Sequence, residues 1–314
     1  MATSEQTHFE AQQEKHDVAL KSVFAAAGLT SIKIVVGVWT GSLGILAEAA
    51  HSSLDFLAAV TTYFAVRISG RPADGGHHYG HGKVENFSAL IQTLLLLTTC
   101  VWIVWEAGRR LLGYEKVDVE VNFWSFAVMA TSIVVDVTRS RMLKRAAIKY
   151  NSQALEADAL HFSTDVWSSA VVIFGLVCVK AGEFFPSLPA LHQLDSVAAL
   201  IVAVIMTYVS VELGMRSIQA LLDAAPFGAR DEVVRVVESI PGVIDCHRVR
   251  VRHGGPKTFV DIHILVSGDE TLRNVHALTD RIEEALKDVI PEADVTVHPE
   301  PPEGHEDDKV RDEI

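Results

Sequence analysis

The chain has 314 residues, of which 49% are hydrophobic, and its mean hydropathy is +0.25. This apolar balance favours a membrane protein. The net charge of −13 argues against a nucleic-acid-binding protein, because such proteins concentrate lysine and arginine. The three cysteines lie far apart and form no CxxC motif, which argues against a disulfide framework and against a thiolate metal cage.

Six apolar segments follow a polar N-terminal tail, residues 1–17, that lacks the pattern of a signal peptide. Each segment is long enough to cross a hydrocarbon layer about 30 Å thick, which takes about 20 helical residues. The segments comprise residues 18–39, 44–68, 84–112, 122–142, 153–181 and 193–216. The sequence therefore predicts a polytopic α-helical membrane protein with a six-helix transmembrane domain over residues 18–222.

The basic residues between the segments predict the orientation of the chain in the lipid bilayer. Arg67, Arg71 and Lys83 lie around the connection between the second and third segments, and five bases lie between residues 139 and 149. Lysine and arginine favour the cytoplasmic side of a membrane. Because six spans return the chain to its starting side, we expect both termini to be cytoplasmic.

Residues 223–300 have the pattern of a small α+β domain in the order αββαβ. Two stretches are amphipathic at helical spacing, and three have the period-two alternation or the turn signals of strands. In chain order the five stretches are RDEVVRVVESI, HRVRVRHG, TFVDIHILVS, TLRNVHALTDRIEEALKDVI and DVTVHPE. The final residues, 301–314, are charged, and we expect them to be disordered.

Two octets inside the apolar segments share one pattern of ionisable residues. EAAHSSLD runs from Glu48 to Asp55 and DALHFSTD from Asp158 to Asp165, and both have the form acid-x-x-His-x-x-x-Asp. An ionisable side chain inside a membrane costs about 2.5–3.5 kcal/mol on insertion scales, so these residues are candidates for function. A helix-packing histidine with a local acid explains one such octet but is a poor explanation for two in register.

The spacing within each octet places histidine and aspartate on one helix face, because residues four apart share a face. Two imidazoles and two carboxylates can complete a tetrahedral shell around a divalent cation, and this mixed ligation suits Zn²⁺ better than Ca²⁺ or Mg²⁺. We expect one metal site near mid-membrane, with the first acid of each octet, Glu48 and Asp158, one turn away in a supporting position. The four candidate ligands are His51, Asp55, His161 and Asp165.

Three stretches of the chain carry a family resemblance: LGILAEAAHSSLD, RPADGGHHYGHGKVE and SQALEADALHFSTDVWSS. They resemble the cation diffusion facilitators, and the resemblance covers nearly the whole chain. It implies a homodimeric metal–proton antiporter with a ferredoxin-like cytoplasmic domain, in which the four candidate ligands form the transport site. Histidine at position 51 resembles the zinc branch, whereas iron- and manganese-selective members more often have aspartate or another residue there. Thr164 stands where serine is common.

The resemblance also implies a peripheral metal site in a cytoplasmic loop. The site falls on Asp74, His77 and His81, and the glycines of this loop allow its side chains to converge. A flexible polar loop with incidental histidines is the alternative. His78 has no assigned role.

A binuclear metal site in the cytoplasmic domain is the next implication of the resemblance. It falls on five residues of the tail: His247, His263, His276, His298 and Glu300. Many family members have aspartate in place of Glu300, and surface histidines without metal are the alternative. His253 in the hairpin matches no family ligand.

Four charged residues lie near or within the apolar segments. The resemblance suggests that Lys83 and Asp223 form an inter-helix charge lock near the dimer interface, and a solvated surface pair is an equal alternative. Lys33 and Asp136 lie inside the first and fourth segments, and their partners cannot be named from the sequence.

We expect a Zn²⁺/H⁺ antiporter of the bacterial inner membrane that exports metal from the cytoplasm by alternating access. Metal and protons compete for the ligands, because histidine must be neutral and aspartate ionised to bind metal. The same fold exporting Fe²⁺, Co²⁺, Cd²⁺ or Mn²⁺ is the main alternative. An intramembrane metalloenzyme needs an open coordination position, which four converging ligands do not leave. A metal-activated receptor without transport is the remaining alternative.

Overall fold

The computed structural model describes residues 4–41, 43–111, 123–184, 194–290 and 292–302. The chain divides into two compact units. The helical unit comprises residues 1–72 and 84–218, and the tail unit comprises residues 73–83 and 219–314. The charged segment that we expect to be disordered lies outside the described residues, apart from its first two positions.

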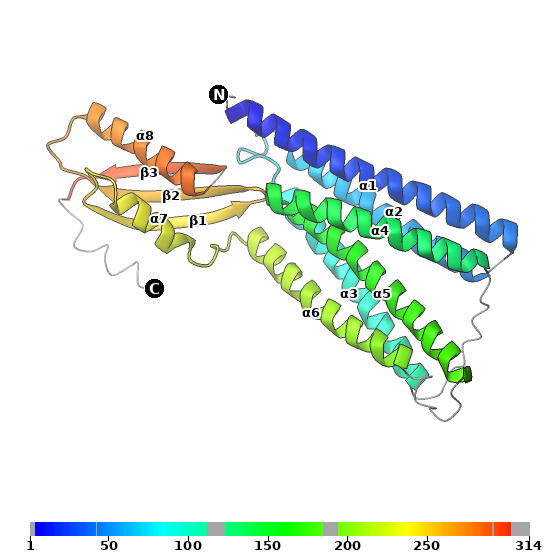
Figure 1. Cartoon of the computed structure of the whole chain (residues 1–314). Coiled ribbons are helices and arrows are strands. Elements are labelled where there is room, and N and C mark those ends of the chain that lie inside the picture. The colour runs from blue at the N-terminus through cyan, green and yellow to red at the C-terminus, as the bar shows by residue number, and fades with distance from the viewer. Residues whose placement is uncertain (1–3, 42, 112–122, 185–193, 291, 303–314) are drawn as a thin grey trace. The chain divides into compact units, whose positions relative to one another are not determined.

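Six long helices account for the helical unit (Figure 1). They are α1 (Ser4–Thr40), α2 (Leu43–Ser69), α3 (Lys83–Leu111), α4 (Phe123–Tyr150), α5 (Gln153–Phe184) and α6 (Leu194–Leu221). Each contains one of the six predicted apolar segments to within a residue or two. Within the described ranges, three stretches are long and apolar enough to cross a membrane: Glu10–Thr40, Lys83–Trp105 and Leu200–Leu221. The count of six spans therefore stays a prediction.

The N-terminal stretch differs from the separate polar tail that the sequence suggests, because helix α1 already begins at Ser4. Polar residues in this first part of α1 bond to other helices. Lys15 forms a buried ion pair with Glu85 of α3 at 3.0 Å, and Gln12 donates to the Val66 carbonyl of α2 at 2.6 Å. These bonds extend α1 beyond the apolar segment, so the polarity of the stretch reflects interhelical contacts.

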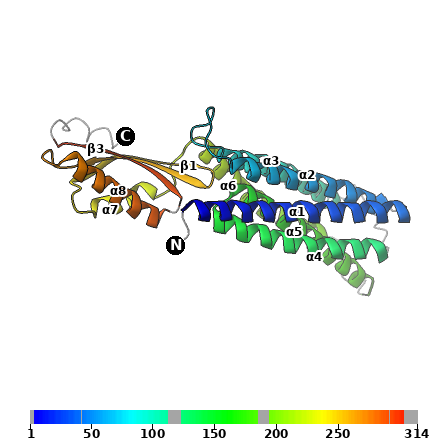
Figure 2. The same ribbon diagram turned by 90° about the horizontal axis from the view of Figure 1, so that it is seen from above.

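Small residues form much of the core of the helical unit. Helix α1 packs against α2 and α4, and α5 packs against α4 and α2 (Figure 2). The buried cluster between them is rich in alanine, which lets helix backbones approach closely. Its alanines are Ala19, Ala26, Ala59, Ala65, Ala146, Ala147, Ala154 and Ala159. Large apolar side chains such as Trp39, Trp102 and Tyr208 are instead exposed, as expected for helices that face lipid.

The tail unit contains the elements α7 (Ala229–Glu238), β1 (Asp245–Gly254), β2 (Lys257–Leu265), α8 (Leu272–Val289) and β3 (Ala293–Glu300). Their order is the predicted αββαβ. Strand β2 is central, antiparallel to β1 and parallel to β3. Both helices pack on one face of this sheet. The core contains Val233 and Val237 from α7, Ile262 and Ile264 from β2, and Ile282 and Leu286 from α8.

Candidate metal sites

The four candidate ligands of the two octets lie together in the helical unit. His51 and Asp55 come from α2, and His161 and Asp165 come from α5. His161 Nε2 lies 3.0 Å from Asp55 Oδ1 and 3.8 Å from Asp165 Oδ2. His51 Nε2 lies 3.8 Å from Asp55 Oδ1 and 3.7 Å from Asp165 Oδ1. Each histidine therefore faces both aspartates, and we call this group the quartet.

Most of the quartet is shielded from solvent, and one of its carboxylate oxygens has no hydrogen-bond partner among the described residues. The side chains of His161, Asp55 and Asp165 are 10%, 12% and 16% exposed, whereas His51 is 43% exposed. Asp165 Oδ2 is buried and accepts no hydrogen bond from the described residues. His51, Asp55 and Asp165 each offer a ligand atom within 4.8 Å of the other two, and His161 lies beside this group through its contacts with the two aspartates.

The first acids of the octets lie beside the quartet and bind cations or hydroxyls of other helices. Glu48 is paired with Lys33 of α1 at 3.1 Å, and Lys33 Nζ also donates to Ser52 Oγ at 2.8 Å. Asp158 is fully buried and accepts a bond from Ser22 Oγ of α1 at 3.4 Å. The partner of Lys33, which the sequence left open, is therefore the octet acid Glu48.

Asp136 pairs with Arg139, one turn later on α4, at 3.4 Å. Arg139 is only 3% exposed, so it is a buried residue rather than one of the loop bases with which the sequence groups it. Its Nε and Nη2 donate to Ser22 Oγ at 3.3 and 3.1 Å, and its Cζ lies 3.4 Å from the ring centre of Phe162. Sequence reasoning missed this network, although an acid and an arginine three residues apart in an apolar helix are its signal.

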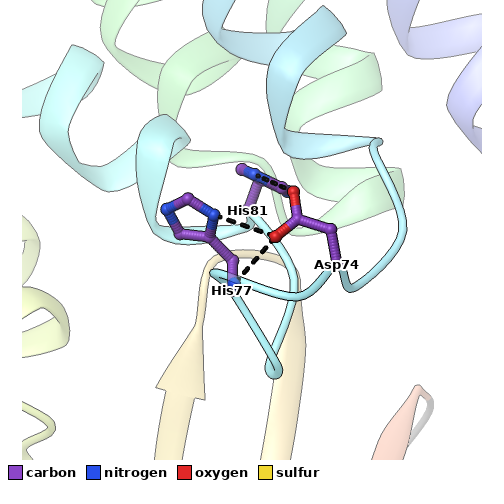
Figure 3. Close-up of side chains that lie close together, drawn as sticks. All are labelled: Asp74, His77 and His81. Carbon is purple, nitrogen blue, oxygen red and sulfur yellow. Dashed lines mark hydrogen bonds and ion pairs between the residues drawn. The ribbon is translucent and has the colours of Figure 1, made fainter.

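The loop between α2 and α3 brings Asp74, His77 and His81 together, as Figure 3 shows. Asp74 Oδ1 lies 3.2 Å from His77 Nδ1, and Asp74 Oδ2 lies 3.4 Å from His81 Nε2. The backbone N–H groups of Gly76 and His77 also donate to Asp74 Oδ1, each at 2.8 Å. These two backbone bonds, with a smaller effect of His77, hold the pKa of Asp74 below its usual value. His78 is exposed and lies outside this group.

The loop lies against the β1–β2 hairpin within the tail unit. A Cβ added to Gly82 would lie 2.0 Å from the Gly254 carbonyl oxygen, so the backbones approach too closely for any side chain there. The Tyr79 ring meets the Phe259 ring edge-on at 5.3 Å, and Arg252 stacks on both rings. These contacts hold the loop that carries the three candidate ligands against the sheet.

Three histidines of the tail lie in one row across the sheet. His247 of β1 is paired in register with His263 of β2, and His263 is paired with His298 of β3. Because side chains alternate along a strand, the row lies on the face opposite α7 and α8. Glu300 follows His298 by two residues and shares this face.

Glu300 connects the three histidines. Its Oε1 lies 2.8 Å from His263 Nδ1 and 3.3 Å from His298 Nε2, and its Oε2 lies 3.3 Å from His247 Nε2. We call these four residues the tail cluster. The long glutamate side chain reaches all three rings, so it does not loosen the group in this structure.

His276 does not join the tail cluster within one chain, which differs from the sequence-based expectation. It lies on α8, its side chain is 76% exposed, and its Nδ1 is 3.9 Å from Asp280. The reason is that α8 covers the opposite face of the sheet. His253 lies at the hairpin, where it bonds to Thr258 Oγ1 at 3.1 Å, and burial lowers its pKa.

Lys83 and Asp223 form an ion pair at 2.9 Å, with side chains 37% and 43% exposed. Asp223 also pairs with Arg252 of β1 at 3.3 Å. The bond from Lys83 is the main reason why the pKa of Asp223 is lowered. The pair expected from the sequence is present, but it is half-exposed, and such pairs contribute little stability on their own.

Family comparisons cover both units. A family model described as the cation efflux transmembrane domain matches residues 19–222, and one described as the cytoplasmic domain of cation efflux proteins matches residues 227–302. The chain is 33% identical over 285 residues to the cation-efflux pump FieF of Yersinia enterocolitica, covering 90% of this chain and 91% of the relative. It is 31% identical over 287 residues to FieF of Salmonella newport, with the same coverage.

Solved structures of part of related transporters are also similar to this chain. The metal-bound C-terminal domain of the CzcD transporter from Thermotoga maritima is 36% identical and covers 23% of this chain and 84% of that one. Its TM-score is 0.22, a value too low to support a structural argument.

Proposed function

The chain belongs to the cation diffusion facilitator family of integral membrane cation-efflux transporters, and we propose that it exports Zn²⁺ from the cytoplasm in exchange for protons. Members of this family are transporters rather than enzymes. The observation that carries the zinc proposal is the quartet, because its two imidazoles and two carboxylates face one another from two helices.

Proton coupling follows from the chemistry of the quartet. A histidine that takes up a proton can no longer bind metal, and a protonated aspartate loses the charge that attracts it. A quartet open to the more acidic outer side would therefore gain protons and release Zn²⁺. Once open to the cytoplasm, it would lose those protons and reload. Alternation between the two states couples the inward proton gradient to metal export.

Two of the helices that contribute no ligand, α1 and α4, support the quartet through buried cations. Lys33 of α1 holds the α2 half through Glu48 and Ser52. Arg139 of α4 holds the α5 half by stacking on Phe162, whose ring contacts that of His161 at 5.3 Å. In this proposal a movement of α2 relative to α5 separates the two ligand pairs, which changes the affinity for metal.

The loop site and the tail cluster have supporting roles in the proposal. The loop residues would bind metal outside the translocation shell. The tail cluster would sense cytoplasmic zinc in a homodimer, and His276 could take part only from outside the cluster of its own chain, because α8 keeps it on the other sheet face. The Lys83–Asp223 pair would act as the charge lock that holds α3 to the end of α6.

The proposed membrane arrangement has six spans in the bacterial inner membrane, with both termini and a ferredoxin-like tail domain in the cytoplasm. The six long helices and the basic residues at the end of α4 support it. The proposed domain limits are residues 18–222 for the transport domain and 223–300 for the metal-binding and dimerisation domain.

Uptake of radioactive zinc into inside-out membrane vesicles tests the proposal. An acidic vesicle lumen should accelerate zinc accumulation, and collapse of the pH gradient should abolish the acceleration. Parallel assays with Fe²⁺, Co²⁺, Cd²⁺ and Mn²⁺ identify the ion that is transported fastest. They are needed because the ligand set predicts only an order of affinity among these ions. A rate of zinc uptake that does not change with the pH gradient would refute proton exchange. Faster transport of another ion would refute the assignment of zinc.

A further inference from the structure

A groove between α1 and α4 lies outside all three candidate metal sites. It has a volume of about 460 Å³. Two helices that lie side by side in Figure 2 form its walls. Its lining residues are Glu14, Val18, Thr138, Arg141, Met142, Arg145, Ala146 and Lys149.

The charge of the groove is positive and partly uncompensated. Arg141, Arg145 and Lys149 follow one another at intervals of four residues, so they share one face of α4. Lys149 is paired with Glu14 at 2.7 Å, and the Tyr150 hydroxyl donates to the same carboxylate. Arg141 and Arg145 are exposed and form no ion pair with any described residue. Two guanidinium groups are therefore available for an anion.

The depth of the groove relative to the apolar segments indicates what kind of anion fits. Val18 is the first residue of the first apolar segment and Met142 is the last of the fourth. With the segment limits predicted from the sequence, the groove lies at the boundary where both helices leave the hydrocarbon layer. Its apolar side chains, Val18, Met142 and Ala146, are buried or half-buried, while the arginines at its rim are exposed.

We propose that this groove binds the phosphate headgroup of an anionic phospholipid from the cytoplasmic leaflet. Guanidinium groups bind phosphate oxygens through paired hydrogen bonds, and the apolar floor suits the glycerol and upper acyl carbons that accompany a lipid phosphate. A soluble phosphate would use the arginines but not the floor. The proposal rests on the cytoplasmic orientation of the α4 C-terminus given above, and it is independent of the metal that is carried.

The same helix offers a matched control. Lys144 is an exposed base that precedes Arg145 by one residue, so it projects from a different face and does not line the groove. Removal of Lys144 lowers the surface charge as much as removal of one arginine does. It leaves the groove intact.

Native mass spectrometry of the purified full-length protein tests the proposal. The protein is equilibrated with equimolar phosphatidylglycerol and phosphatidylethanolamine, and the retained lipids are counted. The wild-type protein should retain phosphatidylglycerol selectively. Arg141→Gln with Arg145→Gln should reduce this selectivity by about fivefold for each arginine, whereas Lys144→Gln should leave it unchanged. The corresponding lysine double variant should keep part of it.

Three outcomes would overturn the proposal. One is unchanged selectivity in the glutamine double variant, and another is an equal loss in Lys144→Gln, which would indicate surface charge rather than a site. The third is displacement of phosphatidylglycerol by millimolar inorganic phosphate, which would indicate a soluble anion as the ligand. The melting temperature of each variant shows whether it folds. If the glutamine double variant misfolds, the lipid selectivity of the lysine double variant is compared with that of the wild-type protein instead. Because retained lipid is measured without transport, failure here would leave the zinc–proton proposal standing.

Discussion

The quartet of the helical unit and the cluster of the tail unit use the same ligand types on different backbone frameworks. The quartet lies between α2 and α5, and three of its four side chains are at most 16% exposed. The tail cluster lies on one face of a sheet, where His247, His263 and Glu300 are 11–18% exposed and His298 is 62% exposed. Backbone pairing places the tail histidines in one row, whereas only side-chain packing places α2 beside α5.

This difference indicates what each site can do. Strand pairing fixes the tail row, because neighbouring strands are joined by backbone hydrogen bonds along their length. The quartet has no backbone bond across its two halves, since a helix satisfies its backbone internally. A small shift between α2 and α5 can therefore open the quartet, but no comparable shift separates the tail histidines. The first arrangement suits a site that must release its metal, and the second suits a sensor.

The largest effect should come from breaking the quartet. We expect Asp55→Asn and His161→Ala each to reduce zinc flux by on the order of a hundredfold or more, because three remaining ligands bind metal poorly and even supporting residues of metal sites contribute 10- to 100-fold. Zinc uptake into proteoliposomes is the measurement, with Thr164→Ser as a control that keeps the hydroxyl. A single variant with near-wild-type flux would show that the quartet is not the transport site.

Removal of Arg139, the buried cation that stacks on Phe162 beside the quartet, should have the next largest effect. Arg139→Met leaves Asp136 and Asp158 without their positive neighbour, and breaking a buried pair costs about 3–5 kcal/mol. We expect zinc flux to fall about tenfold with a raised KM, and Arg139→Lys to recover part of it by restoring the charge without the planar stack on Phe162.

Lys144→Met, at an exposed position of the same helix, is the control for this series. A fall in maximal rate at unchanged KM in Arg139→Met would contradict a role in positioning the α5 ligands. Equal flux in the methionine and lysine variants would contradict the role of the charge.

The tail cluster should respond to zinc by gaining stability rather than by carrying flux. Residues 224–302 contain their own core, so we expect them to fold alone. Zinc at 100 times its Kd should add about 2.7 kcal/mol of unfolding free energy, which raises Tm by roughly ten degrees or more in a domain of this size.

Two variants sharpen this test. His263→Ala should abolish most of the Tm rise, whereas His276→Ala should leave most of it, because His276 lies on α8 away from the cluster. The rise should shrink on acidification, because protons compete with zinc for its ligands. A Tm that does not change when zinc is added would contradict the sensor role and leave the tail only a role in dimerisation.

The smallest effect should come from the loop site. Asp74→Ala with His77→Ala should slow zinc flux only a few-fold, because the loop lies outside the quartet. The lowered pKa of Asp74 keeps its charge from the neutral range down to below its usual value of about 3.9, and that charge is lost only as the pH falls through the lower value. Protonation of this carboxylate should therefore not be what releases loop metal at mildly acidic pH.

A zinc titration at several pH values tests this dependence. It uses a protein with the wild-type loop that carries Asp55→Asn and His263→Ala, so that only the loop site remains. Zinc binding to the loop that is lost only below the usual aspartate range would assign the dependence to the Asp74 carboxylate instead. Complete loss of flux in the loop variant, with folding intact, would make the loop an essential part of the pathway.

Much of this molecule could be predicted from local patterns in its sequence. Apolar length placed the six helices, period-two alternation placed the strands, and HxxxD spacing put each ligand pair on one helix face. These features depend on neighbours within a few residues. The hairpin signal also implied that His247 and His263 lie on neighbouring strands, although the register that aligns them with His298 is visible only in the structure.

The sequence by itself thus determined the elements, the ligand types and the faces they share, because periodicity dictates which side chains of one helix or strand point the same way. Only the tertiary structure decided that Arg139 is buried against Phe162, that Lys33 pairs with Glu48, and that His276 lies on the far side of the sheet. Those outcomes depend on how elements distant in the chain pack together. Packing selects among many partners of similar chemistry, so no local spacing specifies it.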